Sequence, residues 1–415
     1  NMSTLLRWIK KVFKVFGIFL LAIVIIINLF IILSGRFYLY KGIAKTYLMG
    51  KSGPDIYDLD LFPYSTIKKS GETFKWGVDH DYNVYNFTPE EEKLNQKTKT
   101  TAFLVFKGDS LLFEKYYEKH AIGTVSNMFS VAKTVVGMLI GVAIDEGKIK
   151  SLDEKVAKYI PSFESDDKKD ITIRHLMQMA SGLDWEESGK NPLSENAESY
   201  YGNDLYGLVS RQKGVTPPGK EFKYQSGNSQ LLGFIIEKAV GTDLSKYAEQ
   251  KLWTKIGTQS DAFWSLDREN GDEKAFCCLY ATAQDFGRLG RLIMNKGKWN
   301  GEQIVSEKFM VEMFTNRAPI TDDGIENTCY ALHIWTYHDG EDQIYYCRGL
   351  LGQYIAVIPS KNLIFIRLSH NSIPSMDIEE FNKRKERGEK VVSKDIDHSK
   401  EFFQYVETAK KIAGC

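Results

Sequence analysis

Apolar residues are concentrated in one run near the N-terminus and are distributed periodically through the rest of the chain. Residues 15–35 include no charged side chain, and Asn28 and Ser34 are the only polar side chains in that run. A helix rises about 1.5 Å per residue, so 21 such residues just span a hydrocarbon core of about 30 Å. The pattern predicts a transmembrane anchor at residues 15–35, preceded by a cytoplasmic tail at residues 1–14.

A cleaved signal peptide and a buried core helix are the alternatives for this run. The apolar part of a signal peptide is usually about 7–15 residues long and is followed by small residues at a cleavage site. Here the run is longer and no A-x-A pattern follows it, which favours an uncleaved anchor. Basic residues lie on both sides of the run: Arg7, Lys10, Lys11 and Lys14 before it, and Arg36, Lys41 and Lys45 after it. By a small margin, they favour a single-pass protein of the inner (cytoplasmic) membrane with an extracytoplasmic, periplasmic body.

The first half of the body contains a predicted hairpin and a predicted helix. Residues 36–95 are predicted to be an irregular approach segment. Two apolar runs at residues 101–117 are separated by Lys107, Gly108, Asp109 and Ser110, which is typical of a β-hairpin. Residues 128–146 have apolar positions at helical spacing and are followed by Gly147, a suitable C-cap residue.

The second half returns to strands after a helical stretch. Residues 150–260 are mainly helical in pattern, and strand-like runs follow at residues 329–335, 343–347, 354–359 and 363–368. A charged segment at residues 379–390 precedes an amphipathic helix at residues 400–412. Strands at both ends with helices between them predict an α+β fold. We expect an antiparallel sheet flanked by helices, with an inserted all-helical lobe at about residues 150–290 of a domain at residues 96–415.

Composition and charge exclude several classes of protein. The chain is 43% hydrophobic and 26% charged, with a mean hydropathy of −0.30, which fits neither a disordered chain nor a polytopic transporter. The 54 basic and 54 acidic side chains are unevenly distributed, because residues 1–36 hold five basic residues and no acidic one. The remaining body has a net charge of about −5. We therefore expect no nucleic-acid partner, since such proteins usually carry a basic patch.

Cysteine and histidine spacing indicates no metal site. The five cysteines include the adjacent pair Cys277 and Cys278, and their spacing suits neither a zinc site nor a disulfide framework. We expect most of them to pack as small apolar residues. The seven histidines form no H-E-x-x-H or H-x-H pattern. We expect neither a metal nor an organic cofactor.

A Ser-x-x-Lys tetrad is the first candidate for chemistry. Four such tetrads begin at Ser65, Ser130, Ser165 and Ser210, and only the one with Ser130 and Lys133 opens a long apolar helix. Residues i and i+3 of a helix share a face, so the ammonium can approach the hydroxyl. The amides at a helix N-terminus also favour an oxyanion. Alternatively, Ser130 only starts the helix and Lys133 extends to solvent.

Two further clusters could complete a site. Tyr224 and Ser226 stand in a predicted loop immediately before an apolar helix, and a tyrosine near a lysine cation can serve as a general base. Alternatively, Tyr224 is an ordinary loop aromatic. Residues 348–353 hold two glycines between strand-like runs, where a backbone N–H could complete an oxyanion hole. A simple bulge is the alternative there.

The three clusters, in this order, resemble the serine β-lactamase and penicillin-binding-protein superfamily. Ser130 and Lys133 match its S-x-x-K motif, and Tyr224 and Ser226 match its Y-x-N or Y-x-S motif. Further segments resemble its carboxylesterase-like and 6-aminohexanoate-dimer-hydrolase-like branch: residues 145–149, 171–176, 181–185, 230–233 and 275–279. The resemblance covers about residues 100–370, and the fold that it implies agrees with the α+β prediction above.

The third motif departs from the family pattern. Where penicillin-recognising members have K-T-G or H-T-G, this chain most plausibly aligns Leu350, Leu351 and Gly352. The cation that would contact a substrate carboxylate is therefore missing, unless Arg348 replaces it. This departure argues against recognition of antibiotics or D-alanyl-D-alanine.

The resemblance implies a serine hydrolase that uses an acyl-enzyme. In this hypothesis Ser130 attacks the carbonyl of a small ester, amide or peptide, and Lys133 and Tyr224 relay its proton. The backbone N–H groups of Ser130 and Gln353 would hold the oxyanion, and Ser226 would orient the Lys–Tyr pair or the leaving group. The rim of the substrate site would comprise Ser226, Arg348, Leu350, Leu351 and Gly352. A peptidoglycan D-alanyl peptidase or β-lactamase, and a degenerate binding or sensor protein, are the alternatives.

Overall fold

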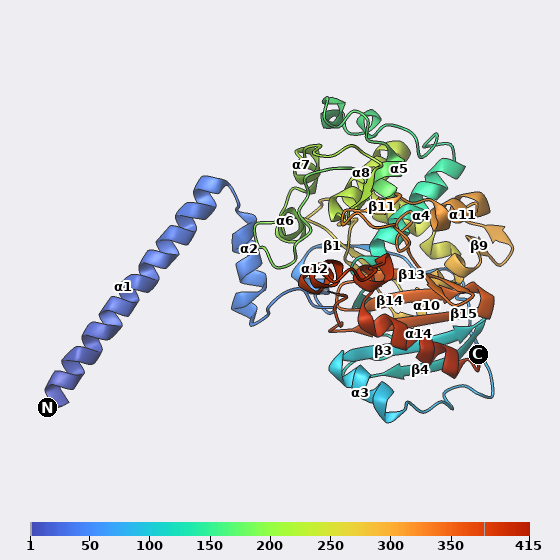
Figure 1. Ribbon diagram of the computed structural model, residues 1–415, viewed down its shortest axis with the longest axis horizontal. Coiled ribbons are helices and arrows are strands. Elements are labelled where there is room, and N and C mark those ends of the chain that lie inside the picture. The colour runs from blue at the N-terminus through green and yellow to red at the C-terminus, as the bar shows by residue number, and fades with distance from the viewer. Residues whose placement is uncertain (1, 377) are drawn as a thin grey trace.

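The N-terminal apolar run forms one long helix that projects from the body of the protein. The structure, a computed structural model, describes residues 2–376 and 378–415. Helix α1 (Met2–Ser34) extends away from the body, and only its C-terminal end lies close to the segment that follows it, as Figure 1 shows. Its span at Thr4–Ser34 has a mean hydropathy of 3.2 and is almost entirely exposed. By length and composition α1 is a candidate membrane span.

The main sheet contains strands from both the N-terminal and the C-terminal part of the body. Within the described residues it has seven strands in the order β12-β13-β14-β15-β3-β4-β2. Neighbouring strands are antiparallel, except that β2 runs parallel to β4. Strand β15 pairs with β3, so segments about 260 positions apart in the chain lie side by side. The strands are β2 (Gly77–Val78), β3 (Thr100–Lys107), β4 (Ser110–Tyr116), β12 (Trp335–Asp339), β13 (Asp342–Gly349), β14 (Gln353–Ile358) and β15 (Leu363–Ser369).

Alternating residues of this sheet face two separate layers of helices. Leu104 and Ile364 pack with α10 (Ala283–Met294), and Phe103 and Phe365 pack with α14 (Lys400–Ile412). Strand side chains alternate between faces, so the near-continuous apolar runs seen in the sequence bury both faces of the sheet. Helices α3 (Pro89–Lys97), α12 (Ile378–Glu386) and α13 (Ser393–Asp397) complete the sheet half of the body.

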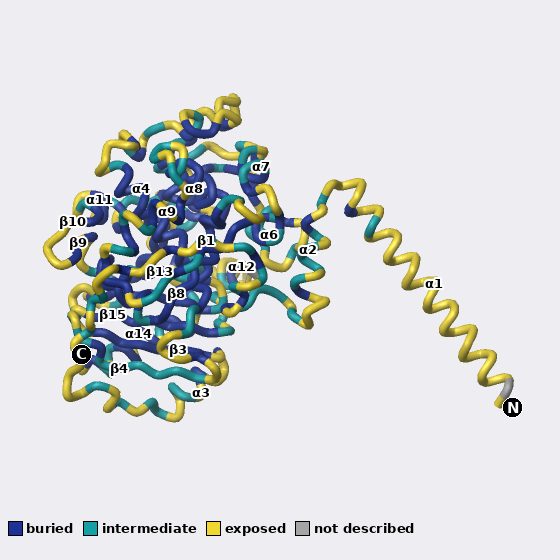
Figure 2. The backbone as a smooth tube through the Cα atoms, turned by 180° about the vertical axis from the view of Figure 1, so that it is seen from behind, coloured by how far each residue is buried: buried dark blue, intermediate teal, exposed yellow. Residues whose placement is uncertain are grey.

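The second half of the body is built around two central helices. Helix α4 (Val131–Asp145) packs against α8 (Ser226–Val240), and both are largely buried, as Figure 2 shows. Shorter helices lie around them: α5 (Ile173–Met177), α6 (Glu195–Tyr201), α7 (Leu205–Ser210), α9 (Leu244–Lys251) and α11 (Glu307–Thr315). Helix α2 (Tyr38–Lys45) lies outside this group and contacts α6.

Short strands form three small sheets beside these helices. A four-stranded sheet has the order β1-β7-β8-β5, with β1 (Tyr64–Ile67), β5 (Ser126–Asn127), β7 (Ala262–Ser265) and β8 (Leu279–Ala281). Two-stranded sheets pair β6 (Glu221–Phe222) with β11 (Ile320–Thr321), and β9 (Lys298–Trp299) with β10 (Glu302–Gln303). Strand β5 ends just before the predicted nucleophile, so the four-stranded sheet holds the chain at that point.

The predicted elements with strong periodicity are confirmed, and the short ones are not. The hairpin, the helix after residue 130, the last three strands and the final helix lie where the pattern placed them. The irregular character predicted for residues 36–95 was wrong, because β1, β2 and α3 lie there. Residues 329–335 are mostly turn and loop rather than strand, and the region at residues 150–290 contributes β6, β7 and β8 besides its helices. Strands of two to four residues are too short to show a period and depend on distant partners, as Tyr64 opposite Ser265 illustrates.

Candidate active site

Ser130 stands on a sharp turn at the start of α4. The preceding residue, Phe129, has a φ of +46°, and its N–H donates a 2.7 Å hydrogen bond to Asn127 Oδ1. This left-handed turn leaves the Ser130 side chain partly exposed, whereas the residues that follow it are buried. Across the described residues, no group accepts a hydrogen bond from the Ser130 N–H. That amide at the helix start is therefore available to a ligand.

Lys133 points at Ser130 and does not extend to solvent. Its side chain is buried, and Nζ donates hydrogen bonds of 2.8 Å to Ser130 Oγ and of 2.8 Å to the Phe276 carbonyl. Nζ also lies 5.0 Å from the centroid of the Tyr224 ring. The structure thus brings together the three side chains that the sequence singled out from two distant segments.

Aromatic contacts fix the orientation of Tyr224. Its ring stacks on Trp335 with centroids 5.7 Å apart and meets Tyr330 edge-on at 5.8 Å. The Arg348 guanidinium lies 3.7 Å from the centroid of the same Trp335 ring and donates to the Asp397 carbonyl. Arg348 therefore already has an aromatic face and an acceptor within the protein, and it is not a free cation at the rim.

Ser226 contacts a carboxylate that the motif analysis missed. Its Oγ donates a 2.5 Å hydrogen bond to Glu187, and its N–H donates one of 2.7 Å to the other carboxylate oxygen. Trp185 Nε1 donates a third, of 2.8 Å. Burial raises the pKa of the Glu187 carboxyl, and the nearby Lys133 ammonium opposes that shift. Ser226 thus holds Glu187 directly, and Glu187 adds a buried carboxyl to the site.

The hairpin turn between β13 and β14 abuts the nucleophile turn. A Cβ placed on Gly349 would lie 2.0 Å from the Met128 carbonyl oxygen, so only glycine permits this approach. Leu350 at the turn is 51% exposed, and Leu351 has a φ of +65°. The Gln353 side chain donates to the Leu350 and Ser369 carbonyls at 3.0 and 2.7 Å, which fixes the turn.

Gly352 faces a buried ion pair. A Cβ at Gly352 would lie 2.2 Å from Arg367 Nη1, and Arg367 lies 3.7 Å from Glu401 with both side chains fully buried. The φ of +82° at Gly352 completes the turn. The residue therefore shapes the site through its backbone.

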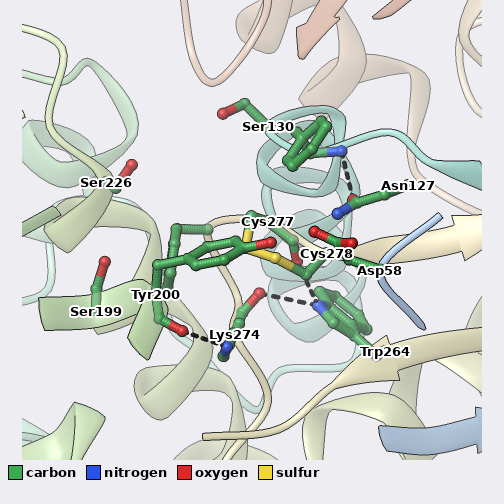
Figure 3. The surroundings of a disulfide bond; sticks show 12 residues. Asp58, Asn127, Ser130, Ser199, Tyr200, Ser226, Trp264, Lys274, Cys277 and Cys278 are labelled. Atoms are coloured by element: carbon green, nitrogen blue, oxygen red, sulfur yellow. Dashed lines mark hydrogen bonds between the residues drawn. A yellow bond between two sulfur atoms is a disulfide. The ribbon is translucent and has the colours of Figure 1, made fainter. Parts of the chain in front are cut away.

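A disulfide between adjacent cysteines lies behind the catalytic candidates. Cys277 and Cys278 are bonded to each other, a disulfide that the spacing of the cysteines did not predict. In the view of Figure 3 the disulfide lies between Ser130 and Lys274. The preceding Phe276 carbonyl accepts from Lys133, and the following Leu279 carbonyl accepts from Met128 N at 3.2 Å. Residues 276–279 thus support both the lysine and the nucleophile turn.

The described side chains offer no metal-binding cluster. Among residues 2–376 and 378–415, no group of three or more His, Cys, Asp or Glu side chains is placed to hold a metal ion. The chemistry of the site must then be argued from the serine, lysine, tyrosine and carboxylate described above.

Comparison with known proteins agrees with this geometry. The sequence profile of the family described as Beta-lactamase matches residues 87–386, well over half of the chain. The chain belongs to the β-lactamase family. It is thus a serine hydrolase of the β-lactamase and penicillin-binding-protein superfamily, with the α+β fold of that family.

Two curated relatives indicate the branch of this family. The chain is 25% identical to 6-aminohexanoate-dimer hydrolase of Paenarthrobacter ureafaciens over 298 residues, 68% of this chain and 75% of that protein. It is 29% identical to teichoic acid D-alanine hydrolase of Staphylococcus aureus over 225 residues, which are 50% of this chain and 51% of that protein.

A solved structure supports the fold of this β-lactamase family member. A Bacillus anthracis protein assigned to the 6-aminohexanoate-dimer hydrolases superposes with a TM-score of 0.68 at 22% identity, covering 85% of this chain and 92% of the other. At this identity the likeness concerns the fold alone.

Proposed function

We propose that this protein is a membrane-anchored serine hydrolase that cleaves an ester or amide through an acyl-enzyme on Ser130. The observation that carries the proposal is the 2.8 Å hydrogen bond from buried Lys133 Nζ to Ser130 Oγ. A hydroxyl becomes a nucleophile when an adjacent base takes its proton. Lys133 is placed for that role in the first turn of α4, next to the partly exposed Ser130.

The proposed reaction has two symmetrical halves. Ser130 Oγ attacks the carbonyl carbon while its proton passes to Lys133 and Tyr224, and the same proton is then delivered to the departing alcohol or amine. Water next attacks the acyl-enzyme and gives a proton to the same pair, which returns it to Ser130 Oγ as the bond between Oγ and the acyl carbon breaks and the acid leaves. The N–H of Ser130 and, as second donor, that of Gln353 would stabilise the oxyanion.

Neutral esters and amides fit the rim best. The exposed rim residue is Leu350, and the Arg348 guanidinium is occupied by Trp335 and Asp397. A substrate carboxylate would lose its hydration there without gaining a partner. The names of the two curated relatives, a 6-aminohexanoate-dimer hydrolase and a teichoic acid D-alanine hydrolase, support cleavage of an amide or ester and say nothing in favour of a neutral substrate.

The second candidate is a D-alanyl peptidase or β-lactamase. A weaker relative from Escherichia coli carries a name of the D-alanyl-D-alanine carboxypeptidase type, matched over 35% of this chain. A degenerate sensor protein is a third candidate, and the intact Ser130–Lys133 hydrogen bond argues against it.

Two covalent probes distinguish these candidates in the full-length protein. We expect a fluorophosphonate to label the protein and a fluorescent penicillin to label it poorly, whereas a peptidase would take both and a degenerate protein neither. Ser130→Ala should abolish labelling and turnover. Ser65→Ala, Ser165→Ala and Ser210→Ala are matched controls from the other three tetrads and should retain both. Turnover at the parent rate by Ser130→Ala would refute the mechanism.

The anchor is proposed to place the body on the extracytoplasmic, periplasmic side of the inner membrane. The support is the span of α1 and the small charge bias across it. Protease added to cells with a permeabilised outer envelope should digest the body. Digestion only after lysis of the inner membrane would place the body in the cytoplasm.

A further inference from the structure

The segment that follows α1 presents its apolar side outward. It comprises Phe37, α2 (Tyr38–Lys45) and the 3-10 turn Tyr47–Met49. Phe37, Tyr47 and Leu48 are 58%, 75% and 78% exposed, and Tyr40 and Met49 are exposed as well. Phe37, Tyr40, Ala44 and Leu48 follow the i, i+3, i+7, i+11 spacing of a single helical stripe.

Its polar side chains point into the protein instead. The Tyr38 hydroxyl donates to the Pro192 carbonyl at 2.8 Å, and Lys41 Nζ donates to Asn203 Oδ1 at 2.7 Å. On the same face, a Cβ at Gly42 would lie 3.6 Å from the Tyr201 ring. This arrangement is the reverse of a helix on a water-soluble surface, where the apolar stripe faces the core.

A hydrogen bond between this segment and α1 shows how far the segment lies from the C-terminal end of α1. The Tyr40 hydroxyl donates to Asn28 Oδ1 at 2.7 Å, and Asn28 lies six residues before the end of α1. At about 1.5 Å per residue, that position is ~9 Å below the end of the helix. Asn28 is also a polar group in an apolar span, where an unsatisfied amide would be costly. The contact therefore keeps α2 beside the outermost turns of the span.

We infer that residues 37–49 form an interfacial seat that lies in the headgroup region of the bilayer that α1 crosses. The inference rests on the proposed anchor, and the occupant follows from continuity with α1 and from the depth of Tyr40. Tyrosine and phenylalanine favour the membrane interface, and an amphipathic segment buries its apolar face about 5–10 Å into it. The occupant is therefore lipid and not a second protein.

The seat is connected to the rim of the active site. Arg36 Nη1 donates to the Leu193 carbonyl at 2.9 Å, and Tyr38 binds the neighbouring Pro192 carbonyl. The same loop carries Glu187, which Ser226 holds at its other end. Seating of residues 37–49 in lipid would place this rim close to the membrane surface, where a surface-bound ester or amide could reach it.

Fluorescence in lipid vesicles tests the seat. The full chain is reconstituted into phosphatidylcholine–phosphatidylglycerol vesicles in a Cys415→Ser background, with an environment-sensitive dye on Leu48→Cys. The control is Val311→Cys on α11, which is also exposed but lies on the side of the body away from α1 in both Figure 1 and Figure 2. We expect a blue-shifted emission and quenching by spin-labelled lipid at position 48 and neither at position 311.

The outcomes separate the seat from the anchor. If the chain stays in the vesicles after alkaline extraction but the dye at position 48 behaves like the dye at 311, the seat is refuted and the anchor stands. A blue shift without quenching by lipid would also refute it, because a protein would then cover the patch. Loss of the chain from the vesicles would refute the anchor itself. Tyr40→Phe keeps the ring and loses the bond to Asn28, so it should weaken the quenching at position 48.

Discussion

Ser226 donates two hydrogen bonds to Glu187, one from its hydroxyl at 2.5 Å and one from its backbone N–H at 2.7 Å. Ser226 is the first residue of α8, and Tyr224 lies two positions before it. Glu187 therefore fixes the loop that presents Tyr224 to Lys133. It is a positioning residue in this arrangement, and the nearby Lys133 opposes the rise that burial causes in the pKa of Glu187.

Glu187→Gln tests this positioning role. The amide can no longer accept from both donors of Ser226, and a hydrogen bond to a charged group contributes about 1.5–3 kcal/mol. We expect kcat/KM for a neutral ester to fall about tenfold or more. Burial raises the pKa of the Glu187 carboxyl, so removal of this titrating group should also change the pH dependence of kcat/KM.

The adjacent glutamate provides the control. Glu186 is exposed and accepts from Asn191, without contact to Ser226, so Glu186→Gln should retain the parent rate and pH profile. An unchanged pH profile in Glu187→Gln, with a lower rate, would mean that Glu187 is structural only.

Lys133 and Tyr224 should act as a unit. Lys133 Nζ lies 5.0 Å from the centroid of the Tyr224 ring, and both residues are proposed to carry the same proton during the reaction. The double variant Lys133→Ala with Tyr224→Phe should then be hardly slower than the more damaged single variant. If the losses in kcat of the two single variants multiply in the double variant, the two residues act independently and the relay is contradicted.

Local periodicity explains why part of the site was predictable. Ser130 and Lys133 are one helical turn apart, so their approach follows from helix geometry once the apolar run is recognised. Tyr224 was found because it precedes another apolar helix within a motif. The strong hairpin and the last strands were found for the same reason, since each has a clear period of its own.

Contacts between distant loops explain what was missed. Glu187 reaches Ser226 across 39 positions, and nothing in its own neighbourhood marks it as a site residue. The Cys277–Cys278 bond was missed because a disulfide framework was sought in the spacing of separated cysteines. The orientation of the Arg348 side chain is set by its contacts with Trp335 and the Asp397 carbonyl. Nothing in the sequence indicates that these residues lie beside Arg348.

The disulfide should affect activity through Phe276. Its carbonyl accepts from Lys133, and the bonded cysteines directly follow it. Dithiothreitol would reduce the bond to two thiols and become a cyclic disulfide itself. We expect kcat to fall several-fold on reduction and to recover on reoxidation, while the circular dichroism spectrum stays unchanged. A Cys277→Ser, Cys278→Ser variant should show the lower rate and no response to dithiothreitol. A parent enzyme indifferent to reduction would show that the bond does not position Lys133.

The free energy of unfolding should decrease as the pH rises, because of Glu237. Burial, followed by the nearby Glu273, raises the pKa of this carboxyl from 4.5 to about 8. Between these values the folded chain holds a proton that the unfolded chain has released, so the free energy of unfolding falls as pH rises. Glu237→Gln should flatten this slope and raise the Tm at pH 8. Glu407→Gln, at an exposed position of α14, should leave the slope unchanged. Equal slopes in the parent and Glu237→Gln would contradict the assignment.

Substrate charge should decide the specificity of the rim. Leu350 is exposed beside the nucleophile turn, and the nearest candidate cation, Arg348, is held by Trp335 and the Asp397 carbonyl. We therefore expect kcat/KM for neutral esters or amides to exceed that for benzylpenicillin or peptides ending in D-alanine, since this ratio reports discrimination in the transition state. Leu350→Lys should raise acylation by penicillin about tenfold, because a charged hydrogen bond contributes about 1.5–3 kcal/mol. Val311→Lys adds the same charge on α11, away from the proposed cleft, and should not change acylation. Efficient hydrolysis of penicillin by the parent protein would instead mean that Arg348 leaves Trp335 to bind the carboxylate, and the protein would then be a true β-lactamase.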